Sequence, residues 1–332
     1  MLKIKVTVNE INFDITGHET NAMNKTIRIG TRGSKLALWQ ANHVAELIRP
    51  SGYRTEIVPV ETQGDRILDV SIARIGSKGV FTEEIEEKLL DGSIDIAVHS
   101  AKDLSSVIPD ELELIAFTER EEVNDVVVSF DKTFRLKNEA VRVGTSSTRR
   151  VAFLRHYYPQ ATSVSIRGNL QTRVSKLKAG ECDCLILAYA GIHRMGFDDL
   201  IVEKIETSYF VPPVGQGSIA VECHKKLSFD KKDIIDRWVN HQPTETCIRA
   251  ERAFLKTLEG GCSIPSFGYG WLEDNSIVLK AGIISLDGQQ LVKVKRVAPV
   301  EDGKELGKSV ATEVLVNGGS RILHDIRNMV KA

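Results

Sequence analysis

The sequence has little net charge, few aromatic residues and no long hydrophobic run. The formal net charge of the 332 residues is −1, so no overall field attracts the chain to nucleic acid or to an anionic membrane. Aromatic residues make up 6% and do not interleave with the basic ones, so a stacking surface for single-stranded nucleic acid is not indicated. No segment approaches the roughly 20 apolar residues that a membrane-spanning helix needs. We therefore expect neither a nucleic-acid nor a membrane partner.

Cysteine is also scarce, and its pattern argues against two kinds of site. The five cysteines are an odd number and no secretory signal accompanies them, so a disulfide framework is not expected. No cluster of cysteine and histidine has the spacing of zinc ligands, so no metal is expected. Cys182 and Cys184 fall at alternate positions of an apolar strand pattern, which favours two small buried side chains. A Walker loop and a dinucleotide glycine fingerprint are both absent.

The length indicates more than one domain. A chain of 332 residues is too long for one ordinary core, so we expect two or three domains. Residues 1–24 include Glu10, Asp14 and Glu19 and lack the composition of a transit or signal peptide. We treat them as an N-terminal extension, either an edge strand or a disordered leader, and expect a cytoplasmic protein.

Strand and helix signals alternate through the first two thirds of the chain. Strands are expected at 27–29, 56–60, 94–98 and 125–129, with a helix after Ser34 and another at 81–90. Three strand–helix units then begin near residues 141, 163 and 185. Residues 62–79 read as a long loop, a kind that is usually functional or disordered. The alternation predicts largely parallel sheets with helices on both faces, where ligands bind beyond the carboxyl ends of the strands.

The last third of the chain changes its pattern. Helices are expected at 244–258, 305–316 and 321–329, and strands at 277–284 and 291–297. Asp287-Gly288 between these strands is a hairpin turn signal. We therefore predict a small α+β domain with an antiparallel sheet.

Positive charge is concentrated in one stretch of this nearly neutral chain. Residues 142–196 contain nine Lys or Arg and two acidic residues. Within the stretch, residues 144–147 (Gly-Thr-Ser-Ser) follow a strand and open a helix that carries Arg149 and Arg150. Free N–H groups at a helix start, hydroxyls and paired arginines suit anionic oxygens. An ordinary capped helix with solvated arginines explains this segment equally well.

Further arginines favour the anion site. They fall at strand ends or helix starts, where they can converge on one cleft. These are Arg32, Arg167, Arg173 and Arg194.

Two other residues are candidates for chemistry. Asp103 follows Lys102 just after a strand of the buried type, where a carboxylate can face a cleft. An Asp at such a position more commonly forms a loop ion pair or caps a helix. Cys262 lies on a glycine-rich loop that can present a nucleophilic thiolate. A small residue filling a tight turn is the simpler interpretation of that cysteine.

Several short segments with distinctive residues follow one another along the chain. They are residues 30–34, 62–65, 76–79, 98–103, 144–150, 167–169, 214–217 and 258–262. Each is weak alone, but together they resemble the porphobilinogen deaminase (hydroxymethylbilane synthase) family over nearly the whole chain. The chain departs from the usual pattern at Thr148, Arg74 and Ser105-Ser106, and none of these changes removes a charged catalytic group.

The resemblance implies an architecture and a reaction. It implies two α/β domains built like periplasmic binding proteins, at 25–118 with 218–238 and at 119–217, and an α+β domain at 239–332. It implies a monomeric transferase of tetrapyrrole biosynthesis, whose dipyrromethane cofactor is joined to Cys262 by a thioether. Four porphobilinogen molecules are added in turn, each with loss of ammonia, and hydrolysis releases hydroxymethylbilane.

The resemblance also implies a role for each matching residue. Asp103 would protonate the leaving amine and stabilise the cationic pyrrole nitrogens. The cofactor would be bound by Cys262, Lys102, Asp103, Thr145, Ser147, Arg149, Arg150, Arg167 and Arg173. The substrate would be bound by Arg32, Ser34, Arg167, Arg173 and Arg194. A lid would contain Lys78, Asp65 and Phe81.

Two other functions compete with this enzyme. A non-catalytic binder of small dicarboxylates on the same fold would keep the arginines without needing Cys262 or Asp103. An RNA-binding protein would use the basic stretch, and its affinity would fall steeply with salt.

Overall fold

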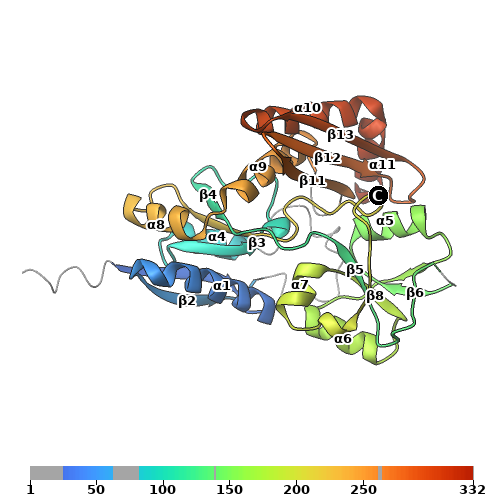
Figure 1. The fold of residues 1–332 in the computed structure, drawn as a ribbon, viewed down its shortest axis with the longest axis horizontal. Coiled ribbons are helices and arrows are strands. Elements are labelled where there is room, and N and C mark those ends of the chain that lie inside the picture. The colour runs from blue at the N-terminus through green and yellow to red at the C-terminus, as the bar shows by residue number, and fades with distance from the viewer. Residues whose placement is uncertain (1–24, 63–81, 138–139, 261–263, 332) are drawn as a thin grey trace, which may run out of the picture.

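The computed structural model describes residues 25–62, 82–137, 140–260 and 264–331, which form three sheets with helices packed on them (Figure 1). The first sheet has the order β2 (Arg54–Val60), β1 (Thr26–Arg32), β3 (Ile96–Ser100), β10 (Ile219–His224), β4 (Leu112–Phe117). The second has the order β7 (Thr162–Val164), β6 (Arg142–Gly144), β8 (Cys184–Ala188), β5 (Asp125–Val128), β9 (Ile201–Lys204). The third is β11 (Ser266–Glu273), β12 (Ser276–Ile284), β13 (Leu291–Pro299). The predicted class, two α/β parts and a small α+β part, is confirmed.

The first two sheets share one arrangement of strand directions. In each, four strands run the same way and the fourth strand in the order runs against them, β10 in the first sheet and β5 in the second. Largely parallel sheets are therefore confirmed, with one reversed strand that periodicity does not reveal. The chain passes to the second sheet through residues 118–124 and returns through 205–218. We call these the crossing segments.

Helices cover both faces of the first two sheets, as the alternation predicted. On the first sheet, α1 (Lys35–Ile48) and α8 (Phe229–Val239) pack on one face and α4 (Glu83–Leu90) on the other. On the second, α5 (Thr148–Tyr157) packs on one face, and α6 (Leu170–Lys178) and α7 (Tyr189–Arg194) pack on the other. Ser34 caps α1 as predicted, because its hydroxyl accepts from Ala37 N–H at 3.2 Å.

The third sheet has one strand more than the sequence predicted. The pattern identified β12 and β13 but missed β11, whose glycines weaken a strand signal. A Cβ at Gly270 would lie 3.3 Å from Cys247 O on α9 (Gln242–Thr257), so close helix packing requires glycine there. With α9, the helices α10 (Gly303–Val314) and α11 (Ser320–Lys331) cover one face of this sheet.

An aromatic cluster joins the second and third sheets. The ring centroid of Phe153 lies 5.2 Å from those of Phe210 and Phe267, and all three side chains are fully buried. Burying a side chain of this size stabilises the fold by roughly 1.5–3 kcal/mol. Cys184 of β8 and Cys182, two residues before it, are buried, which confirms them as small buried side chains.

Some expectations fall outside the described residues. These are the extension at 1–24 and nearly all of the expected loop at 62–79. Among the helices that the structure does describe, none is both long and apolar enough to cross a membrane.

Candidate active site

Asp103 lies just past the carboxyl end of β3, where ligands bind in sheets of this kind. The chain leaves β3 at Ser100 and makes a short 3-10 turn, Ala101–Asp103. The second crossing segment fixes this turn, because Ala101 N–H donates to Ser218 O at 3.0 Å. Asp103 is exposed and Lys102 is half-buried. The carboxylate is therefore open to a ligand while its neighbour is partly enclosed.

Gly215 allows the crossing segment to approach this turn closely. Its φ is +76°, and a Cβ there would lie 2.8 Å from Ala101 C and 3.0 Å from Lys102 N. A non-glycine residue in the left-handed conformation costs about 1–2 kcal/mol. We expect Gly215→Ala to lower the free energy of unfolding by more than this, because the added Cβ also meets the turn. It should also slow turnover, because the turn that carries Asp103 must shift. Gly52→Ala, at φ +80° with open space around it, is the control in urea unfolding; equal losses in the two variants would contradict the prediction.

Residues 144–147 begin α5 as predicted. Ser147 is the N-cap, and its hydroxyl accepts from Arg150 N–H at 3.5 Å. Thr145 is buried, and its hydroxyl accepts from Ser147 N–H at 3.3 Å. Both hydroxyls thus shape the start of the helix, while their contacts with a ligand stay predictions.

Arg149 and Arg150 converge on a buried acid, Asp125 of β5. Arg149 Nη2 lies 2.6 Å from Asp125 Oδ2, and Arg150 Nη2 lies 2.8 Å from Oδ1. Their other N–H groups donate to Val211 O at 2.8 Å and Ile186 O at 3.0 Å. Burial alone would raise the pKa of Asp125, but the two guanidinium groups outweigh burial and hold it well below its usual range. The two arginines are only 4% and 7% exposed, so the interpretation as solvated arginines is wrong.

Charges from the first two sheets meet around Asp103. Burial lowers the pKa of Lys102 to about 8, and burial lowers the pKa of Arg173 to about 10. The charged neighbours of Lys102 are Asp103, Arg150, Asp125 and Arg149. Those of Arg173 are Arg150, Asp103 and Arg167. Five cations thus gather around two carboxylates, and an anionic ligand fits this surplus of positive charge.

The lowered pKa of Lys102 predicts a pH dependence. In the ligand-free protein the side chain loses its proton as the pH rises through about 8 rather than through its ordinary 10.5, so we expect carboxylate binding, and with it cofactor loading of the apoprotein, to fall there. Lys102→Arg should move this fall to higher pH, because arginine stays protonated. Between the two values the unfolded chain binds more protons than the folded one, so this group's contribution to stability rises with pH. A pH profile beside urea unfolding checks both signs; an unmoved profile in the variant would contradict the assignment.

Arg194 connects the first two sheets. Its Nη2 donates to Gly217 O at 2.6 Å, and its guanidinium carbon lies 5.4 Å from the ring centroid of Trp39 on α1. Burial lowers the pKa of Arg194, and Glu121 opposes that shift. Arg32 ends β1, which is parallel to β3 and hydrogen-bonded to it. Arg32 therefore lies at the same end of these parallel strands as Asp103.

Four predicted site residues lie outside the described residues. They are Cys262, Lys78, Asp65 and Phe81. The anchor and the lid therefore stay predictions, while the described part of the site contains Asp103 and its surrounding cations.

Sequence reasoning missed the buried acids, of which two hold the elements around the site. Asp125 begins the otherwise apolar strand Asp-Val-Val-Val, and a carboxylate in such a run is a signal of a paired buried charge. Glu251 of α9 is fully buried; it accepts from Gly215 N–H at 2.8 Å and Gly270 N–H at 2.7 Å, and it pairs with Arg120. Glu251 therefore holds the third sheet against both crossing segments.

Two protein-family models match the chain. The model described as porphobilinogen deaminase, dipyromethane cofactor binding domain, matches residues 27–231. The model described as porphobilinogen deaminase, C-terminal domain, matches residues 245–316. The first match spans both α/β sheets, and the second begins in α9 and ends after α10.

Curated relatives match most of the chain. The porphobilinogen deaminase of Desulfosudis oleivorans is 52% identical over 303 residues, which are 91% of this chain and 98% of that protein. The porphobilinogen deaminase of Cytophaga hutchinsonii is 51% identical over 306 residues, 92% of this chain and 98% of that protein. Among solved structures, the BvgS periplasmic VFT2 domain of Bordetella pertussis gives a TM-score of 0.37 at 16% identity, covering 66% of this chain and 96% of that domain.

Proposed function

The chain belongs to the porphobilinogen deaminase family, and from that premise we propose which role each of its site residues has in the reaction. The enzyme deaminates porphobilinogen and joins four molecules head to tail on a covalent dipyrromethane cofactor, and hydrolysis then releases hydroxymethylbilane. This is a transferase reaction of tetrapyrrole biosynthesis. The family match favours this reaction over the carboxylate binder and the RNA-binding protein that the sequence left open.

The enclosed cations around Asp103 support this assignment of the site. Burial penalises their charge, as the lowered pKa values of Lys102 and Arg173 indicate, and a bound anion offsets that penalty. Each pyrrole carries an acetate and a propionate, so carboxylates accumulate as the chain of rings grows. The cations therefore fit a dipyrromethane, which supplies the growing end of the chain when it is bound.

We assign the proton transfers to Asp103. Its carboxyl group donates a proton to the amino group of porphobilinogen, which leaves as ammonia. The resulting carboxylate then stabilises the positive charge that develops on the pyrrole nitrogen. A proton given up when the rings join returns to the same carboxylate, so Asp103 is ready for the next addition.

We assign carboxylate binding to the surrounding residues. An arginine fork can donate two parallel hydrogen bonds to a carboxylate. The cofactor would be held by Lys102, Thr145, Ser147, Arg149, Arg150, Arg167 and Arg173. The incoming substrate would be held by Arg32, Ser34, Arg167, Arg173 and Arg194. The covalent anchor would be Cys262, and a lid would contain Lys78, Asp65 and Phe81.

The intact mass of the denatured protein tests this function. We expect an excess equal to two porphobilinogen units minus two ammonias, because a thioether to Cys262 survives denaturation. The excess should be absent from Cys262→Ala and present in Cys247→Ala, which removes a buried cysteine. A protein that stays unmodified after incubation with porphobilinogen would overturn the assignment.

We further propose that the enzyme is a cytoplasmic monomer. Its three domains would comprise residues 25–118 with 218–238, 119–217 and 239–332. The return of the chain to the first sheet at β10 supports the divided first domain. Light scattering of the purified protein tests the monomer.

A further inference from the structure

The third sheet carries three lysines on the face opposite its helices. Lys280 lies on β12, Lys293 and Lys295 lie on β13, and the register places Lys280 directly opposite Lys295. None of the three forms an ion pair with another described residue. Like charges directly opposite each other destabilise a sheet. Lys280 and Lys295 therefore repel each other, and a bound anion would offset that repulsion. We call this surface the lysine face.

Two aromatic rings form the floor of the lysine face. Tyr269 and Trp271 of β11 stack with their centroids 5.2 Å apart. The ammonium groups of Lys280 and Lys295 lie 5.9 Å and 5.1 Å from the centroid of Trp271. Burial lowers the pKa of Lys280, and the neighbouring lysines lower it further. The positive charges are therefore held over aromatic rings, beside Glu273, whose Oε1 accepts from Trp271 Nε1 at 2.7 Å.

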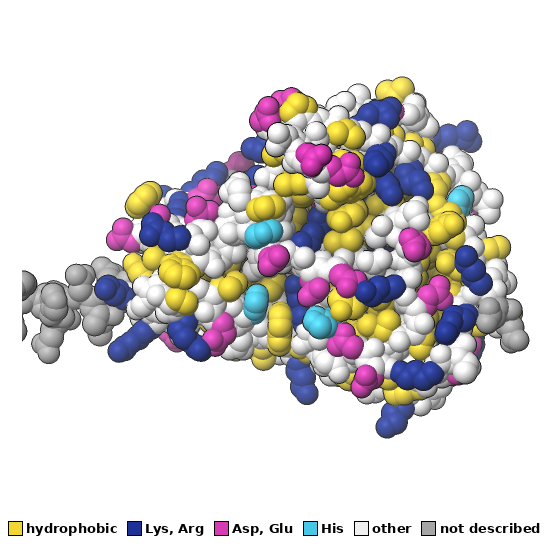
Figure 2. Space-filling view, in the orientation of Figure 1, with side chains coloured by type: hydrophobic (Ala, Val, Ile, Leu, Met, Phe, Trp, Pro, Cys, Tyr) yellow, Lys and Arg dark blue, Asp and Glu magenta, His cyan; other side chains and the backbone are white. Residues whose placement is uncertain are grey.

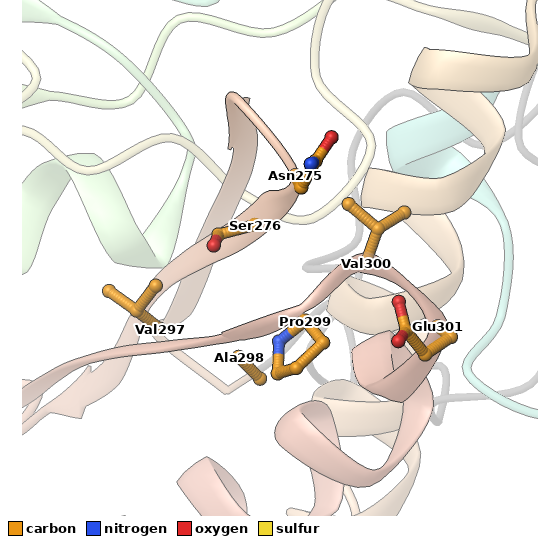
Figure 3. A pocket seen from close by; sticks show the side chains of 7 residues that line it. All are labelled: Asn275, Ser276, Val297, Ala298, Pro299, Val300 and Glu301. Carbon is orange, nitrogen blue, oxygen red and sulfur yellow. The ribbon is translucent and has the colours of Figure 1, made fainter.

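A hollow lined by apolar and polar side chains adjoins these charges. Val297, two residues after Lys295 on the same strand, is 58% exposed. It lines an open surface depression of about 770 Å³. Figure 3 places Val297 and the one acidic residue of the lining, Glu301, at opposite ends of it. In Figure 2, Lys and Arg side chains gather beside hydrophobic ones over the third sheet.

The lysines, the aromatic rings and the hollow together indicate which kind of ligand fits the lysine face. Three cations without an ion pair suit several anionic groups, and Lys293 Nζ also donates to Ser208 O at 3.1 Å. The hollow and the aromatic floor suit an apolar body that joins these groups. Adjacent strands lie about 4.8 Å apart and alternate residues of a strand about 7 Å apart. Lysines at this backbone spacing can reach carboxylates on neighbouring small rings.

We propose that the lysine face binds a polycarboxylate tetrapyrrole outside the catalytic cleft. The proposal rests on the proposed function, because the reaction yields four rings that each carry two carboxylates. Two sources share this chemistry, the linear product of this enzyme and a macrocycle made from it. Binding there would hold the released product on the enzyme after it leaves the cleft.

Equilibrium binding of two probes to the holoenzyme tests the proposal. Uroporphyrin I represents the macrocycle, and a linear octacarboxylate bilane without the hydroxymethyl group represents the product. We expect Lys280→Gln/Lys295→Gln to weaken binding by about tenfold, or about 1.4 kcal/mol. Lys304→Gln/Lys308→Gln on α10, where both residues are exposed, is the matched control and should bind normally. The probe that loses more affinity identifies the source.

Four further measurements make the proposal falsifiable. Removing the opposed charges should raise the Tm of the double variant, so a lower Tm would contradict the like-charge argument. Equal binding by both double variants, or full competition by inorganic pyrophosphate, would overturn a tetrapyrrole site. The rate of porphobilinogen consumption and the intact mass of each preparation separate this failure from a failure of the proposed function. An active, cofactor-loaded enzyme that shows no difference between the variants would refute only the lysine face.

Discussion

Replacing Asp103 with asparagine should slow turnover by about a hundredfold to ten-thousandfold, the usual contribution of a general acid–base. The amide has nearly the size and shape of the carboxyl group but cannot cycle a proton or balance a positive charge. Asp103 is exposed, so the fold and the covalent cofactor should survive the change. Ammonia release in a single turnover measures the effect directly.

Two controls make the result for Asp103→Asn specific. Asp110→Asn changes another exposed acid of the same connection between β3 and β4 and should leave the rate unchanged. The intact mass of Asp103→Asn should still include the cofactor, which separates a catalytic defect from failed assembly. Near-normal turnover by this variant would remove Asp103 from the mechanism.

Arg149→Leu or Arg150→Leu should have the second large effect, on both stability and cofactor loading. Each change leaves Asp125, whose side chain is fully buried, with one of its two guanidinium partners. Breaking a buried ion pair typically costs about 3–5 kcal/mol. If these arginines also bind the carboxylates of the cofactor, the fraction of protein that carries the added mass should fall as well. Urea unfolding and intact mass measure the two effects.

A double variant separates the structural role of Arg150 from its binding role. Asp125→Asn combined with Arg150→Leu removes the stranded charge, so most of the lost stability should return. Cofactor loading should stay low if Arg150 binds the cofactor, whereas loading that recovers together with stability would assign it to Asp125 alone. Fully loaded and active enzyme from both single variants would contradict the predicted loss of loading.

The candidate site was predictable where it depends on neighbours along the chain. The cap by Ser147, the place of Arg149 and Arg150 at the start of a helix, and the turn of Asp103 after a strand all follow from spacing within a few residues. The partners of these groups were not predictable. Asp125 lies 24 residues before Arg149 on another strand, and Glu251 lies 131 residues after Arg120. No local pattern relates residues at such separations.

The sequence by itself determined most of the strands and helices and the family, because each depends on short segments. It did not predict β4, β9, β10, β11 or α8. Only the tertiary structure decided that β5 and β10 are reversed, since their direction depends on how the chain crosses between the two sheets. It also decided that Arg149 and Arg150 are enclosed, and that Lys280 and Lys295 face each other over Trp271. The partner of a charge is set by which strands become neighbours, and pairing of strands depends on the whole fold rather than on local sequence.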